Sequence, residues 1–135
     1  MLFDLAYETL SEWIWRAKDC HPDDEEQMFC EYKIMYYFYQ LCNAVHKLHN
    51  MKIVHLDIKP DNIFIFRRDE RPKRVLKLGD FGISKCLWED SKYKHTGQLN
   101  KNLMPPDYRM AKDLEVGYKT DIWQLGVILF QMITL

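Results

Sequence analysis

Acidic, amide and lysine side chains gather in one short stretch of this chain. The stretch His55-Leu56-Asp57-Ile58-Lys59-Pro60-Asp61-Asn62 is followed by the triplet Asp80-Phe81-Gly82. Oxygen ligands of the kind that Asp80 and Asn62 offer suit Mg²⁺. Moving a phosphoryl group needs little covalent help, but it needs a positioned acceptor hydroxyl and metal ions that offset the charge of the phosphate oxygens. These residue types are compatible with such chemistry.

Two further clusters follow in order. Met104-Pro105-Pro106-Asp107 comes next, and Asp121, Trp123 and Gly126 then form a D-x-W-x-x-G pattern. A single carboxylate is usually a surface group or a turn cap, but that explanation does not cover the whole ordered set. With these clusters the chain resembles the eukaryotic protein kinase family, which has an H-x-D-x-K-x-x-N catalytic loop, a D-F-G triplet and an A-P-E element. The resemblance covers essentially the whole chain.

The resemblance implies a role for each residue nearest the chemistry. Asp57 would accept or orient the proton of the substrate hydroxyl, and Lys59 would steady the γ-phosphate of ATP. Asn62 and Asp80 would hold Mg²⁺, with Asp80 bridging to the β- and γ-phosphates. Phe81 would be the packing switch beside this metal ligand. The implied cofactors are ATP and Mg²⁺, and the implied partner is a protein substrate.

The first residues extend the resemblance to the nucleotide pocket. Residues 1–6 resemble the last strand of the small lobe as it runs into the hinge, whose backbone would contact the adenine. The side chain of Phe3 would be the gatekeeper, and Phe64 would form the pocket floor, a role that is compatible with a plain core position. The expected nucleotide-binding residues are Phe3, Asp4, Leu5, Ala6, Lys59, Asn62, Phe64 and Asp80.

Substrate type and subfamily follow from finer resemblances. Lys59 is typical of the serine/threonine form of the catalytic loop. Thr9-Leu10-x-x-Trp13-Ile14 and His95-Thr96-Gly97-Gln98 resemble the stress-activated kinases that phosphorylate the alpha subunit of translation initiation factor 2. By this resemblance Thr96 is the regulatory phosphorylation site. Residues 55–65 also resemble the Wee-type cell-cycle kinases, which stay as the alternative subfamily.

The chain departs from the family pattern at several positions. Leu56 replaces the arginine that usually pairs with a phosphorylated activation loop, and leucine cannot form a charge-assisted hydrogen bond with phosphate. Residues 99–102 lack the expected Gly-Thr, and Asp107 stands where a glutamate is usual. These departures leave open an alternative in which the chain is an inactive, pseudokinase-like binding module.

Apolar periodicity predicts the elements that position these residues. A helix is expected from a cap at residues 22–26 to residues 49–50, with two apolar stripes, one of them formed by Met35, Tyr39 and Cys42. Short strands are expected at residues 52–54, 62–66 and 75–78, the last two as a hairpin whose tip is the charged stretch 67–74. A long polar loop spans residues 86–107, and a buried helix, apolar at Ile122, Leu125, Ile128, Leu129 and Met132, covers residues 120–135.

These elements predict an α+β, protein-kinase-like fold that is truncated. We expect residues 1–135 to form a partial kinase domain, with the hinge and a mainly helical large lobe that carries short β-hairpins. The sequence contains no glycine-rich phosphate loop, and we expect the small lobe and the C-terminal helices to be missing. We therefore expect this chain alone to be inactive.

Composition limits the compartment and the partners. The 135 residues are 47% hydrophobic and 29% charged, which fits one globular domain. The net charge of −1 gives no reason to expect nucleic-acid or membrane binding. The apolar residues 122–135 are too short to span a bilayer. The four scattered cysteines, Cys20, Cys30, Cys42 and Cys86, fit free thiols in an intracellular, most simply cytoplasmic, protein.

Overall fold

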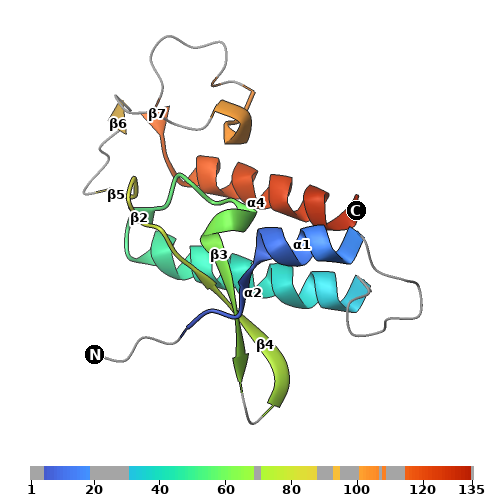
Figure 1. The fold of residues 1–135 in the computed structure, drawn as a ribbon. Helices are drawn as coiled ribbons and strands as arrows, with labels where there is room; N and C mark the ends of the chain where they lie inside the picture. Colours follow the sequence, from blue (N-terminus) through green and yellow to red (C-terminus); the bar gives the residue numbers. More distant parts are fainter. Residues whose placement is uncertain are drawn as a thin grey trace.

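The computed structural model describes residues 5–18, 31–68, 71–87, 93–94, 101–106, 108 and 115–134 (Figure 1). Its described elements are, in order, β1 (Glu8–Thr9), α1 (Leu10–Lys18), α2 (Glu31–Asn50), β2 (Ile53–Val54), the 3-10 turn η1 (Pro60–Asn62), β3 (Ile63–Arg68), β4 (Arg71–Leu78), β5 (Lys85–Cys86), β6 (Tyr93–Lys94), the 3-10 turn η2 (Lys101–Leu103), β7 (Glu115–Val116) and α4 (Tyr118–Ile133). The elements confirm the predicted α+β class with short strands.

Helix α2 is the centre of the packing, because it contacts both β4 and α4. Its buried face carries Ile34, Tyr37, Leu41 and Val45. The helix ends at the predicted residues, whereas its predicted cap at residues 22–26 lies outside the described residues. Of the second apolar stripe, Met35 and Tyr39 are exposed, which contradicts the expectation that the stripe is buried, whereas Cys42 is partly buried against the core.

Helix α1 was not predicted, although the sequence contains a capping signal at its start. The Thr9 hydroxyl accepts a hydrogen bond from the Glu12 N–H at 3.2 Å, and the Glu12 carboxylate accepts one from the Thr9 N–H at 2.7 Å. This reciprocal pair is a capping box, which fixes the first turn of a helix. The buried Trp13 then packs edge-on against Tyr37 of α2, with ring centroids 5.0 Å apart.

Strands β1, β3 and β4 form an antiparallel sheet in the order β1-β3-β4. The predicted hairpin is confirmed, but β3 and β4 extend through most of the charged stretch assigned to its tip. One reason is that α2 supports the edge of β4. The Gln40 side chain accepts the Leu76 N–H at 3.1 Å and donates to the Arg74 carbonyl at 3.4 Å. The charged residues at the ends of β3 and β4 are therefore part of the ladder and not of a loop.

Helix α4 starts slightly before the predicted residue 120 and buries Leu125, Ile128 and Met132, as expected. The prediction that Ile122 is buried was wrong, because 57% of its surface is exposed. Asp121 and Gln124 take inward positions instead, both with 0% exposure. The helix therefore turns part of its polar face toward the protein interior.

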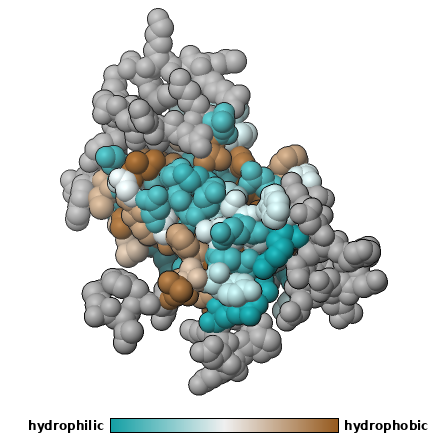
Figure 2. Space-filling model, viewed as in Figure 1, coloured by the Kyte–Doolittle hydropathy of each residue, from teal (hydrophilic) through white to brown (hydrophobic). Residues whose placement is uncertain are grey.

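The remaining described elements are small. Strands β2 and β5 form one two-stranded ladder, and β6 and β7 form another. The face seen in Figure 2 is mainly hydrophilic over its centre and carries smaller hydrophobic areas toward its edges. Within the described ranges, no helix is both long enough and apolar enough to cross a membrane.

Candidate active site

The loop between β2 and η1 carries the predicted catalytic residues, and α4 holds it in place (Figure 1). The buried Asp121 carboxylate accepts the His55 N–H at 2.9 Å and the Leu56 N–H at 2.8 Å. His49 at the end of α2 contacts the same carboxylate through Nε2 at 2.8 Å. Both oxygens of Asp121 therefore bind a loop that is distant in sequence.

His55 links the loop to the end of β4. Its Nδ1 accepts the Asp57 N–H at 3.3 Å, so the proton must lie on Nε2, which donates to the Gly79 carbonyl at 3.0 Å. Burial lowers the pKa of His55, which keeps the ring neutral. The Ser84 hydroxyl donates to the His55 carbonyl at 3.2 Å. This neutral imidazole thus joins the backbone of Asp57 to the segment that carries Asp80.

Asp57, Lys59 and Asn62 are in direct contact. Asp57 Oδ2 accepts hydrogen bonds from Lys59 Nζ at 2.8 Å and from Asn62 Nδ2 at 2.9 Å. The same Asn62 amide donates to the Asp57 carbonyl at 2.9 Å. The hydrogen bond to Asp57 raises the pKa of Lys59, so this lysine is a cation at neutral pH. Among the described residues, Asp57 Oδ1 has no hydrogen-bond donor.

Asp80 lies next to this cluster because the β3–β4 pairing extends as far as Asn62 and Gly79, the residue before Asp80. Ile63 is opposite Leu78 in the ladder, and the Gly79 N–H donates to the Asn62 carbonyl at 2.9 Å. Asp80 follows directly, with φ of 59°, and its Oδ1 accepts the Gly82 N–H at 3.2 Å. The half-exposed Phe81 ring packs 4.8 Å from the His55 ring.

The side chains of Asn62 and Asp80 fit a magnesium site. Asn62 is buried and uses its amide nitrogen for Asp57, which leaves its oxygen without a donor in the described part of the chain. Asp80 is exposed and keeps Oδ2 similarly available. Mg²⁺ commonly takes one or two protein oxygens and completes its shell with water and substrate phosphates. Within the described part of the chain, no group of three or more His, Cys, Asp or Glu side chains could hold a metal ion.

The expected nucleotide-contact residues are only partly described. The Tyr7 N–H donates to the Ile65 carbonyl at 2.9 Å, so the chain after Leu5 and Ala6 runs beside β3. Phe64 lies on β3 with its ring against Gly79, where an added Cβ would come within 2.6 Å of the ring. A side chain at position 79 would therefore require the Phe64 ring to move. Phe3, Asp4 and Thr96 lie outside the described residues.

Leu56 occupies an apolar site. It is 1% exposed and forms a cluster with Val54. The partly buried residues packed against this pair are Ile83, Leu87, Tyr108 and Tyr118. Ile83 and Leu87 follow the Asp80-Phe81-Gly82 triplet, Tyr108 lies about twenty residues later, and Tyr118 begins α4. Leu56 has φ of 70°, a left-handed conformation that is uncommon outside glycine.

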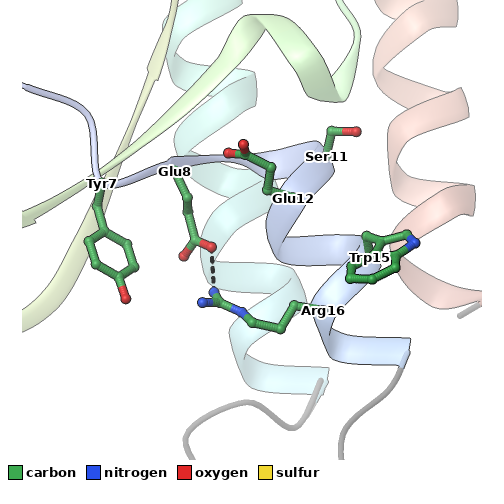
Figure 3. Close-up of a pocket in the computed structure, with 6 residues that line it drawn as sticks. All are labelled: Tyr7, Glu8, Ser11, Glu12, Trp15 and Arg16. Carbon is green, nitrogen blue, oxygen red and sulfur yellow. Dashed lines mark hydrogen bonds and ion pairs between the residues drawn. The ribbon is translucent and has the colours of Figure 1, made fainter.

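An open groove beside α1 has a volume of about 640 Å³ and is lined by Tyr7, Glu8, Ser11, Glu12, Trp15 and Arg16 (Figure 3). None of the predicted site residues lines it. Glu8 forms ion pairs with Arg16 and with Arg74, so its charge is already compensated. The groove is therefore separate from the catalytic-loop cluster.

Comparison with known sequences identifies the family. The family described as "Protein kinase domain" matches residues 8–135. The chain belongs to the protein kinase family. Among the solved structures, this kinase domain is similar to a chain in the crystal structure of the yeast RNA Pol II CTD kinase CTDK-1 complex, with a TM-score of 0.73 and 23% identity over 96% of this chain and 38% of the other. That likeness confirms the protein-kinase-like fold.

Curated relatives of this kinase domain are serine/threonine kinases. The Drosophila melanogaster ovarian-specific kinase Lok is 39% identical over 70% of this chain and 19% of its own length. The probable kinase nek1 of Dictyostelium discoideum is 34% identical over 79% and 24%. Translation initiation factor 2-alpha kinase 3 of Rattus norvegicus is 33% identical over 93% and 11%. The chain thus spans a quarter or less of these relatives.

Residues outside the family motifs also hold the site of this kinase domain. His49, Ser84 and Gln124 each hydrogen-bond to the catalytic loop or to the aspartate that supports it, and none was predicted. Their partners lie far away in sequence, which no local pattern reveals. For Gln124 one signal was available, since a glutamine stood among the apolar residues of a helix expected to be buried.

Proposed function

We propose that this kinase domain transfers the γ-phosphate of ATP to a serine or threonine hydroxyl of a protein. The observation that carries the proposal is the state of the Asp57 carboxylate. Lys59 and Asn62 both bind Oδ2, and Oδ1 stays available for an acceptor hydroxyl. A hydroxyl held there can pass its proton to the carboxylate or be turned into line for attack.

The neighbouring side chains suit the other tasks of the reaction. Lys59 is cationic and lies beside Asp57, where it can also neutralise a phosphate oxygen. Asn62 and Asp80 can hold Mg²⁺, and the bound ion would offset negative charge on the phosphates. The backbone near Leu5 and Ala6, with Phe64 below, would receive the adenine. Phe3 and Asp4 complete this proposed nucleotide set.

A pseudokinase-like binding module is the competing function. The contacts of Asp57, Lys59 and Asn62 argue against it, because they place a cation and an amide on one carboxylate oxygen and leave the other oxygen available to a hydroxyl. We further propose the alpha subunit of translation initiation factor 2 as the substrate and Thr96 as a modification site. The similarity to the rat kinase over 93% of the chain supports this, although relatives of other kinase groups match at similar identity.

The test is phosphate transfer by the purified gene product in a form that includes a phosphate-binding small lobe, since we expect residues 1–135 alone to be inactive. Labelled ATP is supplied with Mg²⁺ and either the alpha subunit of translation initiation factor 2 or a generic Ser/Thr substrate. Asp57→Asn should lower kcat by about 100-fold or more, the range typical of a general base. The matched control is Asp61→Asn, an exposed carboxylate of the same loop, which should lose less than about tenfold.

Either of two results would contradict the proposal. One is transfer that survives Asp57→Asn at more than a tenth of the parent rate. The other is nucleotide binding without any transfer, which would favour the binding module. Transfer to the generic substrate alone would leave the kinase function standing and reject the proposed substrate.

A further inference from the structure

Gln124 holds the peptide groups on both sides of the candidate catalytic aspartate. It lies one helical turn after Asp121 on α4 and is 0% exposed. Its Oε1 accepts the Ile58 N–H at 2.9 Å, and its Nε2 donates to the Leu56 carbonyl at 2.9 Å. In the D-x-W-x-x-G pattern this position is unspecified, so the family motif assigns it no role.

These contacts complete the hydrogen bonding of the backbone around Asp57. Gln124 binds the Leu56 carbonyl and the Ile58 N–H. The Asp57 N–H donates to His55, and its carbonyl accepts from Asn62. The two peptide planes that flank a residue define its φ and ψ, and these set the direction of its side chain. One amide on α4 therefore contributes to the orientation of both planes.

The backbone before Asp57 needs this support. Leu56 has φ of 70°, which is unfavourable for a residue with a β-carbon and persists only where the surroundings fix it. Asp121 holds the N–H of Leu56, and Gln124 holds its carbonyl. The glutamine amide accepts from one peptide and donates to the other. Glutamate lacks the donor, methionine lacks both groups, and asparagine is one methylene shorter.

We infer that Gln124 is a positioning residue for Asp57, acting by clamping the Leu56 carbonyl and the Ile58 N–H so that the Asp57 carboxylate faces the acceptor hydroxyl. The inference rests on the proposed kinase function for its activity readout. It predicts that kcat depends on the side-chain amide of Gln124. A methionine can replace the apolar part of this side chain, but it cannot form the two hydrogen bonds.

The experiment is a double-mutant cycle in the gene product. Gln124→Met should lower kcat about tenfold or more and leave KM for ATP within about twofold, because the nucleotide contacts lie elsewhere. In the Asp57→Asn background, the same substitution should change the residual kcat by less than about twofold. Gln40→Met is the matched control. Gln40 makes the same pair of backbone hydrogen bonds, to Leu76 and Arg74, on β4. It should affect stability while leaving kcat within about twofold.

A merely structural role would give a different result. Rates are corrected for the folded fraction, measured by circular dichroism at the assay temperature. Equal losses of kcat in the parent and Asp57→Asn backgrounds would overturn the inference, as would an unchanged kcat in Gln124→Met. Gln124→Glu adds a second check, since it keeps the acceptor for the Ile58 N–H but sets a carboxylate oxygen against the Leu56 carbonyl, so it should lose at least as much kcat as Gln124→Met.

A readout without activity separates this inference from the proposed function. If the parent shows no transfer that depends on Asp57, the proposed function fails. The clamp is then judged by nuclear magnetic resonance of the same labelled protein. Gln124→Met should shift the Asp57 carboxyl carbon signal and speed hydrogen exchange at the Ile58 amide, whereas Gln40→Met should do neither. Unchanged Asp57 and Ile58 signals in Gln124→Met would overturn the inference.

Discussion

Replacing Leu56 with arginine tests whether this residue, which departs from the family pattern, lies in an apolar site. Leu56 is 1% exposed and is surrounded by the apolar residues Val54, Ile83 and Leu87. Arginine is the residue that the family resemblance implies at this position. We nevertheless expect Leu56→Arg to destabilise the fold, because Leu56 is buried among apolar side chains.

The size of the effect follows from two contributions. Burying a leucine side chain stabilises a protein by about 1.5–3 kcal/mol, which the substitution forfeits. A charge left in an apolar site without a partner costs about 3–5 kcal/mol, part of which a long arginine side chain avoids by reaching toward solvent. A net loss of about 3 kcal/mol is therefore the conservative estimate. For a chain of this size it corresponds to a Tm about 10 °C lower.

The assay compares Leu56→Arg with Leu56→Met by circular dichroism melting and by urea titration. Methionine conserves volume and apolar character, so it should cost less than about 1.5 kcal/mol. The reasoning would be refuted if the arginine variant melted within about 3 °C of the methionine variant. That result would mean that a carboxylate or solvent reaches the guanidinium group of the introduced side chain. Any activity measured for Leu56→Arg must be corrected for its folded fraction.

Four further outcomes are expected. The isolated 135-residue chain should show no transfer above background in a labelled-ATP assay, because it has no glycine-rich loop to cover the phosphates; turnover sensitive to Asp57→Asn would contradict this. In an active gene product, Asp80→Ala should abolish transfer while leaving the melting curve unchanged, and activity retained with Mg²⁺ still required would reject the metal assignment. Thr96→Ala should lower kcat/KM by less than about tenfold, equivalent to roughly 1.4 kcal/mol, because Leu56 offers a phosphate no cation; a hundredfold loss would show that another cation binds it. Because burial lowers the pKa of His55, the unfolded state binds a proton below about pH 6.5 that the folded state does not. The unfolding free energy should therefore decrease as pH falls below that value, and urea titrations of the parent and of His55→Gln should show a smaller decrease in the variant.

The contacts within the catalytic loop could be predicted because they are local. Asp57, Lys59 and Asn62 lie within a few residues of one another, and one tight turn brings their side chains together. The paired strands β3 and β4 then carry Asp80 to the same place. A sequence motif is reliable for such a cluster, because turn geometry and strand register leave few other arrangements.

The exposed faces of the helices could not be predicted in the same way. Periodicity shows that α2 and α4 are helical, yet Ile122, Met35 and Tyr39 face outward. An apolar pattern that surrounds most of a helix does not show which side meets a neighbour. Burial in α4 is decided instead by the catalytic loop, whose backbone groups need polar partners and draw Asp121 and Gln124 inward.

The catalytic loop is therefore stabilised mainly from outside itself. The N–H groups of His55, Leu56 and Ile58 all donate to two side chains of α4 that are separated in sequence from the loop by more than sixty residues. A loop with a left-handed residue next to its candidate catalytic aspartate would not keep this shape alone. Since catalysis is sensitive to displacements of about 1 Å in a catalytic group, the position of α4 becomes part of the active site. A substitution that shifts α4 should therefore impair transfer, even where every motif residue is intact.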